Sequence, residues 1–206
     1  MEEKKPKAFD IEQPLKAKIV RPEGDVIVTL RFPNDNEWIE RSRRRKTRSR
    51  NLGNGKTQSI PQLPDPHDTE LVNSLIIGEG AVADEYEAKR VLDYMSTTAV
   101  DADIVREGAN LKIPLRIFGC QTTHIIRVPT EREKGEFVQA SGIPTISQGS
   151  IETYGFNLGG AADLYAKLRK EVIGYTGSVS VVHALAVISA AFEFIDQEIE
   201  GDDPNQ

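Results

Sequence analysis

Several residue types on which common kinds of protein site depend are scarce in this sequence. It contains a single cysteine, Cys120, together with three histidines and one tryptophan among 206 residues. Because a lone cysteine cannot form an internal disulfide, we expect the chain to fold in a reducing compartment such as a cytoplasm. No stretch approaches the roughly 18 consecutive apolar residues of a membrane-spanning helix, and no apolar segment follows Met1 to Pro6 as in a secretory signal. We therefore expect no membrane partner.

The few histidine and cysteine residues also argue against a metal centre or a catalytic site. His67, His124 and His183 lie far apart in the chain. Cys120 stands four positions before His124, so the two side chains share a face only if the strand between them is unbroken. A strand thiol and a half-exposed imidazole are the expected structure there, and no Gly-x-Ser-x-Gly nucleophile elbow is present. The sequence thus predicts no catalytic residue, no metal ligand and no cofactor.

Residues 50–57, Arg-Asn-Leu-Gly-Asn-Gly-Lys-Thr, end like a phosphate-binding loop. Such a loop needs a glycine at its first position and a hydrophobic strand before it. Arg50 stands in place of that glycine, and no hydrophobic strand precedes it. We therefore interpret this segment as a flexible turn and not as a nucleotide site.

Positive charge is concentrated in one segment of an otherwise acidic chain. Residues 41–56 carry eight basic side chains and no acidic one, whereas the other 18 basic residues face 32 acidic ones, a balance of −14. This segment is the only one with strong chemical character. Its candidate residues for binding a partner or nucleic acid are Arg41, Arg43, Arg44, Arg45, Lys46, Arg48 and Arg50.

Three interpretations of this basic segment remain open. Arginine clusters bind phosphates, so the segment could bind nucleic acid. However, no aromatic residue is interleaved within it to stack on bases, and the acidic remainder of the chain repels a polyanion. It could instead dock on an acidic protein surface, or be a solvated helix face that leads into a loop.

The chain also contains an internal repeat. Residues 15–33 (LKAKIVRPEGDVIVTLRFP) align without a gap with residues 111–129 (LKIPLRIFGCQTTHIIRVP), at a constant spacing of 96 positions. The similarity continues more weakly to the end of each half. We interpret it as a tandem duplication, because the hairpin, its exit and the order of the following segments agree together.

Hydrophobic periodicity predicts the same elements in each half. Alternating apolar residues indicate strands at 15–21 and 25–32, and again at 111–117 and 122–128, where Pro114 suggests a strand at the edge of a sheet. Helical spacing indicates a helix after each hairpin, the first running into the arginine stretch, and two more in each half, with 162–172 and 179–198 in the second. The predicted fold class is α+β, with one repeat at residues 10–98, a second at 99–200, and flexible tails at 1–9 and 201–206.

Two arrangements of these repeats remain open. Because an isolated two-stranded hairpin is marginally stable, the two hairpins could pair into one four-stranded sheet within a single pseudo-symmetric domain. Alternatively, the repeats form separate units.

The exits of the two hairpins resemble a pattern in small tail proteins of long-tailed bacteriophages. The relevant residues are Val28 to Asp35 (VTLRFPND) and Ile125 to Glu131 (IIRVPTE). These proteins, the tail assembly chaperones, show a hairpin that leads through a Leu-Arg-x-Pro-Thr-like exit into a charged helix. The resemblance implies a non-enzymatic protein of the bacterial host cytoplasm that binds the tape-measure protein and tail-tube subunits. A nucleic-acid-binding protein that uses the basic segment and a structural subunit of the virion are the alternatives.

Overall fold

The structure is a computed structural model that describes residues 8–44, 46–53, 56–60, 64–100, 102–140, 145–147, 150–154 and 157–200. Helices and several small sheets confirm the predicted α+β class. The chain divides into two compact units. Unit 1 comprises residues 1–11, 97–137 and 159–206, and unit 2 comprises residues 12–96 and 138–158.

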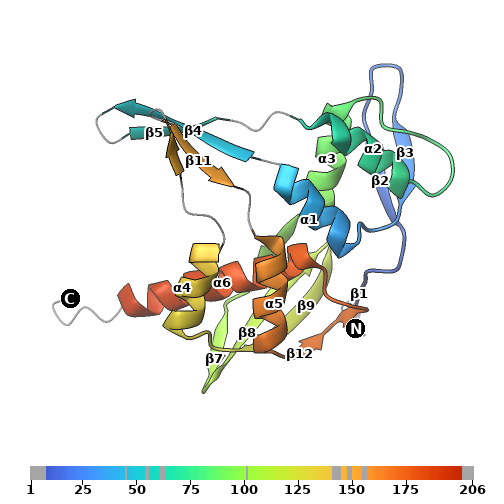
Figure 1. Ribbon diagram of the computed structural model, residues 1–206. Coiled ribbons are helices and arrows are strands. Elements are labelled where there is room, and N and C mark those ends of the chain that lie inside the picture. Colours follow the sequence, from blue (N-terminus) through green and yellow to red (C-terminus); the bar gives the residue numbers. More distant parts are fainter. Residues whose placement is uncertain are drawn as a thin grey trace. The chain divides into compact units, whose positions relative to one another are not determined.

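Unit 2 is built around a hairpin, a group of helices and a second sheet (Figure 1). β2 and β3 form a two-stranded sheet of their own, beside which Figure 1 shows α2 and α3. The second sheet has four strands in the order β10-β11-β4-β5. The elements are β2 (Leu15–Ile19), β3 (Val26–Leu30), α1 (Asp35–Arg44), β4 (Lys46–Gly53), β5 (Lys56–Ile60), α2 (Pro66–Leu75), α3 (Glu85–Met95), β10 (Thr145–Ser147) and β11 (Ser150–Tyr154).

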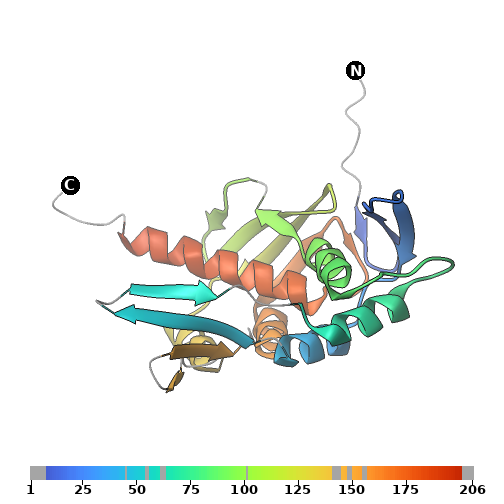
Figure 2. The ribbon, with the colours of Figure 1, turned by 90° about the horizontal axis from the view of Figure 1, so that it is seen from above.

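Unit 1 is built on an antiparallel sheet in the order β12-β9-β8-β6, in which β7 also pairs with β8. Its longest helix, α6, contacts β8 and β6 (Figure 2). A short parallel pair, β1 with β13, completes it. The elements are β1 (Phe9–Asp10), β6 (Thr98–Val100), β7 (Val105–Glu107), β8 (Asn110–Ile117), β9 (Cys120–Arg127), most of α4 (Glu131–Ala140) and of α5 (Leu158–Leu168), β12 (Arg169–Ile173), β13 (Tyr175–Thr176) and α6 (Val181–Glu200).

The apolar residues that alternate along the strands form the core of each unit, as the sequence predicts. The buried face of β8 consists of Leu111, Ile113, Leu115 and Ile117, and each of these side chains is at most 1% exposed. In unit 2, Val28 and Leu30 are buried together with the apolar face of α3. Burial of these faces supplies the main stabilising free energy of both sheets.

The two hairpins have the same register. Leu15 pairs with Leu30, and Leu111 pairs with Ile126. Each residue of the second pair lies 96 positions after its counterpart in the first pair, which is the spacing of the sequence repeat. The two hairpins do not pair with each other. β2 and β3 form a two-stranded sheet, whereas β8 and β9 lie within the larger sheet. The expectation of one four-stranded sheet made from the two hairpins is therefore wrong. The larger sheet instead gains its extra strands from segments 98–107 and 169–173.

The helices that follow the hairpins also correspond. α1 begins at Asp35 and α4 at Glu131, 96 positions apart, and their last residues have the same spacing. α2 and α5 both end at a leucine, and the residue after each helix pairs with the same position of its hairpin: Ile76 with Leu30, and Arg169 with Ile126. This agreement is what a duplication would produce, and the common origin of the two halves stays a prediction.

The strand-to-helix junctions are held by one pattern of hydrogen bonds in both halves. Arg31 Nη2 lies 2.6 Å from Glu37 Oε1, and Arg127 Nη2 lies 2.7 Å from Glu133 Oε1. Each glutamate also accepts the backbone N–H at the start of its helix, at 2.8 Å from Asn34 and 2.9 Å from Thr130. The Asn34 and Thr130 side chains in turn accept the backbone N–H of these glutamates, which completes a capping box. The hydrogen bonds from Arg127 and Thr130 lower the pKa of Glu133 to about 2.

Removing either cap residue is expected to destabilise its helix. Asn34→Ala and Thr130→Ala should each lower the free energy of unfolding by about 1 kcal/mol, because the backbone N–H at the third helical position loses its acceptor. Urea unfolding followed by circular dichroism measures this. Asn36→Ala is the matched control, since Asn36 lies exposed in the first turn of the same helix. An equal loss in Asn36→Ala would contradict the capping role.

Pro114 does not mark an edge strand. β8 is an interior strand, with β9 on one side and the short strands β7 and β6 on the other. β7 pairs with β8 as far as Lys112, and β6 begins to pair at Leu115. Pro114 therefore lies in the gap between the two short strands, where its missing N–H costs no ladder hydrogen bond. The prediction recognised the constraint on proline but assigned it to the wrong kind of position.

Two further segments differ from the sequence predictions. α5 ends at Leu168, and residues 169–173 form the strand β12, because they pair with β9 instead of continuing the expected helix at 162–172. The described residues of the segment interpreted as a flexible turn, 50–53 and 56–57, lie in the paired strands β4 and β5, with a register shift between Asn51 and Gly53. The first helix runs into the arginine stretch as predicted and ends at Arg44.

Among the described residues, no helix combines the length and the apolar character that crossing a bilayer would require.

Candidate binding site at the basic segment

The seven candidate basic residues fall on two elements of unit 2. Arg41, Arg43 and Arg44 form the last turn of α1. The backbone of Lys46, Arg48 and Arg50 belongs to β4, which pairs with β5 and β11. Arg45 and the side chains of Lys46, Arg48 and Arg50 lie outside the part of the chain that the structure describes. What can be determined of the site therefore rests on the three arginines of α1.

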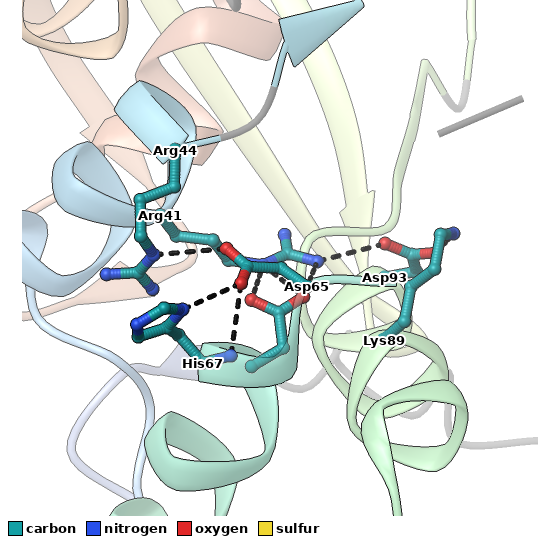
Figure 3. Close-up of polar contacts among 7 residues, drawn as sticks. Arg41, Arg44, Asp65, His67, Lys89 and Asp93 are labelled. Carbon is teal, nitrogen blue, oxygen red and sulfur yellow. Dashed lines mark hydrogen bonds and ion pairs between the residues drawn. The ribbon is translucent and has the colours of Figure 1, made fainter. Parts of the chain in front are cut away.

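Arg41 points into the protein instead of toward a partner (Figure 3). Its side chain is 7% exposed, and its Nε lies 3.1 Å from Asp68 Oδ1 and 3.2 Å from Oδ2, while Nη2 lies 3.2 Å from Oδ2. Asp68 is fully buried in the first turn of α2. A buried, charge-assisted pair of this kind is strong when both members are present. Arg41 thus ties α1 to α2.

The same guanidinium extends the network to α3. Arg41 Nη2 lies 3.4 Å from Asp93 Oδ1, and Lys89 pairs with the other carboxylate oxygen of Asp93 one turn away. On the α1 side, Arg41 Cζ lies 5.7 Å from the centre of the Trp38 ring, a cation–π distance. The arginine therefore joins three helices and one aromatic ring within unit 2.

Arg44 forms a second, more exposed pair. Its Nε lies 3.2 Å from Asp65 Oδ2, and His67 Nδ1 lies 3.0 Å from Oδ1 of the same carboxylate (Figure 3). Asp65 is the N-cap of α2 and also accepts the backbone N–H of His67. Partial burial raises the pKa of Asp65, but the hydrogen bonds from His67 and Arg44 outweigh it and hold the pKa below its usual value.

Arg43 is the one arginine of the three that is both solvent-exposed and without an ion pair to any described residue. Its position on the last turn of α1 directs it away from the face that carries Arg41, because residues two apart on a helix do not share a face. Of the described candidates, it is therefore the best placed to reach a partner.

Unit 1 contains the two buried histidines in a hydrogen-bonded aromatic cluster. His124 Nδ1 lies 2.8 Å from the Tyr165 hydroxyl, and His183 Nδ1 lies 2.9 Å from the Tyr175 hydroxyl. Both imidazoles are 0% exposed, so the expectation of a half-exposed His124 is wrong. Burial lowers the pKa of His124 to about 4 and of His183 to about 3.

These histidines fit a structural role. Each is neutral near pH 7 and uses one ring nitrogen to satisfy a buried tyrosine hydroxyl, which is the usual requirement for a buried polar group. Within the described residues, no three potential ligands are grouped as a metal site would require.

Comparison with known proteins finds no match among protein-family models, curated proteins or solved structures.

The basic segment was identified from composition, but its acidic partners were not. Asp65 and Asp68 lie in the proline-punctuated connector and first turn of α2, far from Arg41 in sequence. The Asp-Pro-His-Asp sequence is typical of a helix start. Nothing in a single sequence shows that one acidic residue of a helix start is buried against an arginine of another helix.

Proposed function

We propose that this protein is a non-enzymatic assembly protein of a phage or prophage tail. It acts in the cytoplasm of the bacterial host and binds tape-measure and tail-tube proteins. The observation that supports this proposal is the construction of the two hairpin exits. Both have the same register and the same arginine–glutamate–cap hydrogen bonds, and these exits are the segments that resemble tail assembly chaperones.

The physical argument concerns what such a unit offers to a partner. In each half, a hairpin is fixed to the start of a charged helix by the capping box and the ion pair, so the strand and the helix present one rigid surface. Two similar surfaces on one chain can engage two similar segments of a long partner at once, which raises the overall affinity.

Affinity purification of the tagged, full-length chain from phage-producing cells tests the proposal. We expect a very long helical protein or a tail-tube subunit to be recovered equally with and without nuclease treatment. Purified particles should lack the chain, because a chaperone leaves the assembled tail. Its presence in those particles would identify it as a structural subunit and contradict the assembly role.

Nucleic-acid binding is the second candidate, and the exposure of Arg43 favours it. If it is the function, nuclease should abolish recovery of the partner, binding to DNA should weaken steeply with salt, and Arg43→Glu should weaken it further. Arg43 is the informative position, because a change at Arg41 would disturb the folding of α1 against α2. Arg132→Glu, on the exposed face of α4 in unit 1, is the charge-matched control.

A further inference from the structure

β2 of unit 2 is paired along one edge, and no described strand pairs with its other edge. Among the described strands, it pairs only with β3. The other edge of β3 is taken by the segment after α2, since Ile77 N–H donates to Thr29 O at 2.7 Å and Arg31 N–H donates to Leu75 O at 2.9 Å. The outer edge of β2 is therefore the place where this sheet can extend.

The register determines which backbone groups point out from that edge. Thr29 and Arg31 direct their backbone groups away from β2, so positions 27, 29 and 31 are not hydrogen-bonded to β2. Their opposite residues, Lys16 and Lys18, then occupy non-hydrogen-bonded pairs of the antiparallel ladder. Their backbone N–H and C=O groups face outward, which is the arrangement that an added strand requires.

A groove of about 370 Å³ lies beside this edge. One wall is β2, and the other is the face of α3 on which Glu87, Arg90, Val91 and Tyr94 recur at helical spacing. Ala17 and Ile19 of β2 also line it. The groove thus combines an open strand edge with an apolar lining and a charged rim.

The corresponding edge in unit 1 is filled. β8 aligns with β2 at the spacing of the repeat, and its outer edge pairs with β6 and β7. α6, which begins 96 positions after α3, contacts both β8 and β6. In unit 1, short strands therefore pair with the strand edge that no described strand occupies in unit 2.

The strand that fills this place also shows which chemistry suits it. Lys112, the counterpart of Lys16, forms an ion pair with Glu107 of β7 at 2.6 Å. The residues that precede β2 at the spacing of β7 are 9–11, which belong to unit 1 and do not pair with β2. Phe9 and Asp10 form β1, which pairs with β13 of unit 1. Among the described residues, no strand covers the outer edge of β2 as β6 and β7 cover that of β8.

The charges around the groove favour an acidic occupant. Lys16 and Arg90 form no ion pair with any described residue. The one carboxylate in the lining, Glu87, is held by Arg21 at 2.7 Å, and Lys18 pairs with Asp25. Lys16 and Arg90 therefore flank this edge as cations without an ion pair to a described residue, although Arg90 is near enough to Glu87 to lower the pKa of that carboxyl group.

We propose that an extended acidic segment of a partner protein binds the outer edge of β2 as an added strand. Its backbone pairs with Lys16 and Lys18, its carboxylates meet Lys16 and Arg90, and its apolar side chains enter the groove beside α3. This site goes beyond the assembly role, because it holds for any partner that presents such a segment.

Hydrogen exchange and fluorescence polarisation on the full chain test this site. The probe is the labelled peptide Ser-Val-Glu-Val-Glu-Val-Ser with blocked ends. In the free protein, the amides of Lys16 and Lys18 should exchange fast, and the peptide should slow them selectively. The same peptide with backbone N-methyl groups at alternate residues should bind at least about tenfold more weakly, because it cannot complete the ladder.

Charge reversal tests the acidic preference. Lys16→Glu and Arg90→Glu should each weaken peptide binding by roughly tenfold, because an attractive contact becomes repulsive. Lys170→Glu, at an exposed position of β12 in unit 1, should leave binding unchanged. Unaltered circular dichroism spectra should accompany each variant, and the N-methyl comparison on the native chain decides the question if a variant misfolds.

Four outcomes would overturn the proposal. Slow exchange of the Lys16 and Lys18 amides in the free protein would mean that the edge is already covered. Equal binding of the N-methylated peptide would show that no backbone ladder forms, and displacement of the peptide by a single-stranded DNA oligonucleotide would indicate a general anion-binding surface. Failure of the peptide to bind would overturn the binding site but not the assembly role, because that role is tested by recovery of tail proteins.

Discussion

Arg41→Met is expected to lower the free energy of unfolding of unit 2 by about 3–5 kcal/mol. The substitution keeps most of the side-chain volume but removes the guanidinium that hydrogen-bonds the buried carboxylate of Asp68. Asp68 is 0% exposed, so water cannot replace the lost hydrogen bonds without opening the junction of α1 and α2. The penalty arises because a buried carboxylate loses the hydrogen bonds and the opposite charge that Arg41 supplies.

Intrinsic fluorescence during urea unfolding measures this loss. Trp38 is the only tryptophan of the chain, and its ring lies 5.7 Å from the Arg41 guanidinium carbon, so the signal reports on this junction. Arg43→Met, two positions along the same helix and solvent-exposed, should change the free energy of unfolding by no more than about 0.5 kcal/mol.

The double variant Arg41→Met with Asp68→Leu separates the two contributions. Replacing both charges with apolar side chains of similar volume should recover much of the stability, because no buried charge is left unpaired. If the double variant were as unstable as the sum of both single variants, Arg41 and Asp68 would not be energetically coupled, which would contradict a loss that arises from Asp68 losing Arg41.

Acidification from pH 7 to pH 5 is expected to destabilise unit 1, in a range that lies above the ordinary pKa values of carboxyl groups. His124 and His183 have pKa values of about 4 and about 3 in the folded chain, below the ordinary value of 6.5, because both rings are buried. Between pH 6.5 and 4, the unfolded chain binds a proton on each ring while the folded chain does not. The contribution of the two neutral rings to the free energy of unfolding is therefore fully present above pH 6.5. It falls as the pH is lowered, by about 1.4 kcal/mol per pH unit for each histidine.

The expected loss for the two histidines together is about 3–4 kcal/mol between pH 7 and pH 5. Hydrogen exchange of the β8 and β9 amides under native conditions reports on unit 1. His124→Gln should roughly halve the dependence on pH, since one of the two titrating rings is gone. His67→Gln is the control: the His67 side chain is 64% exposed, and its removal should leave the pH dependence of these amides unchanged. A flat profile from pH 7 to pH 5 would contradict the assignment of neutral, buried imidazoles.

The histidine–tyrosine cluster of unit 1 shows what residue patterns in the sequence predict and what they do not. The sequence placed His124 on a strand and His183 on the final apolar helix, both correctly. It did not show that each ring would find a tyrosine hydroxyl, because Tyr165 and Tyr175 come from other segments and meet the histidines only through packing. A lone histidine in a sequence carries no sign of the donor or acceptor that will satisfy it.

The sequence alone determined the local features of this protein. Strand alternation, the proline and glycine turns, and the Asn34 and Thr130 caps act over a few residues, so the hairpins and most helices were predictable. Tertiary structure alone decided which strand edge is covered. β2 and β8 have similar sequences and the same register, yet β8 gains β6 and β7, while β2 pairs only with β3 among the strands that the structure describes. It likewise decided that Arg41 meets Asp68 while Arg43 faces solvent. These outcomes depend on contacts between residues far apart in the chain. Such contacts produce no periodic pattern in the sequence from which they could be predicted.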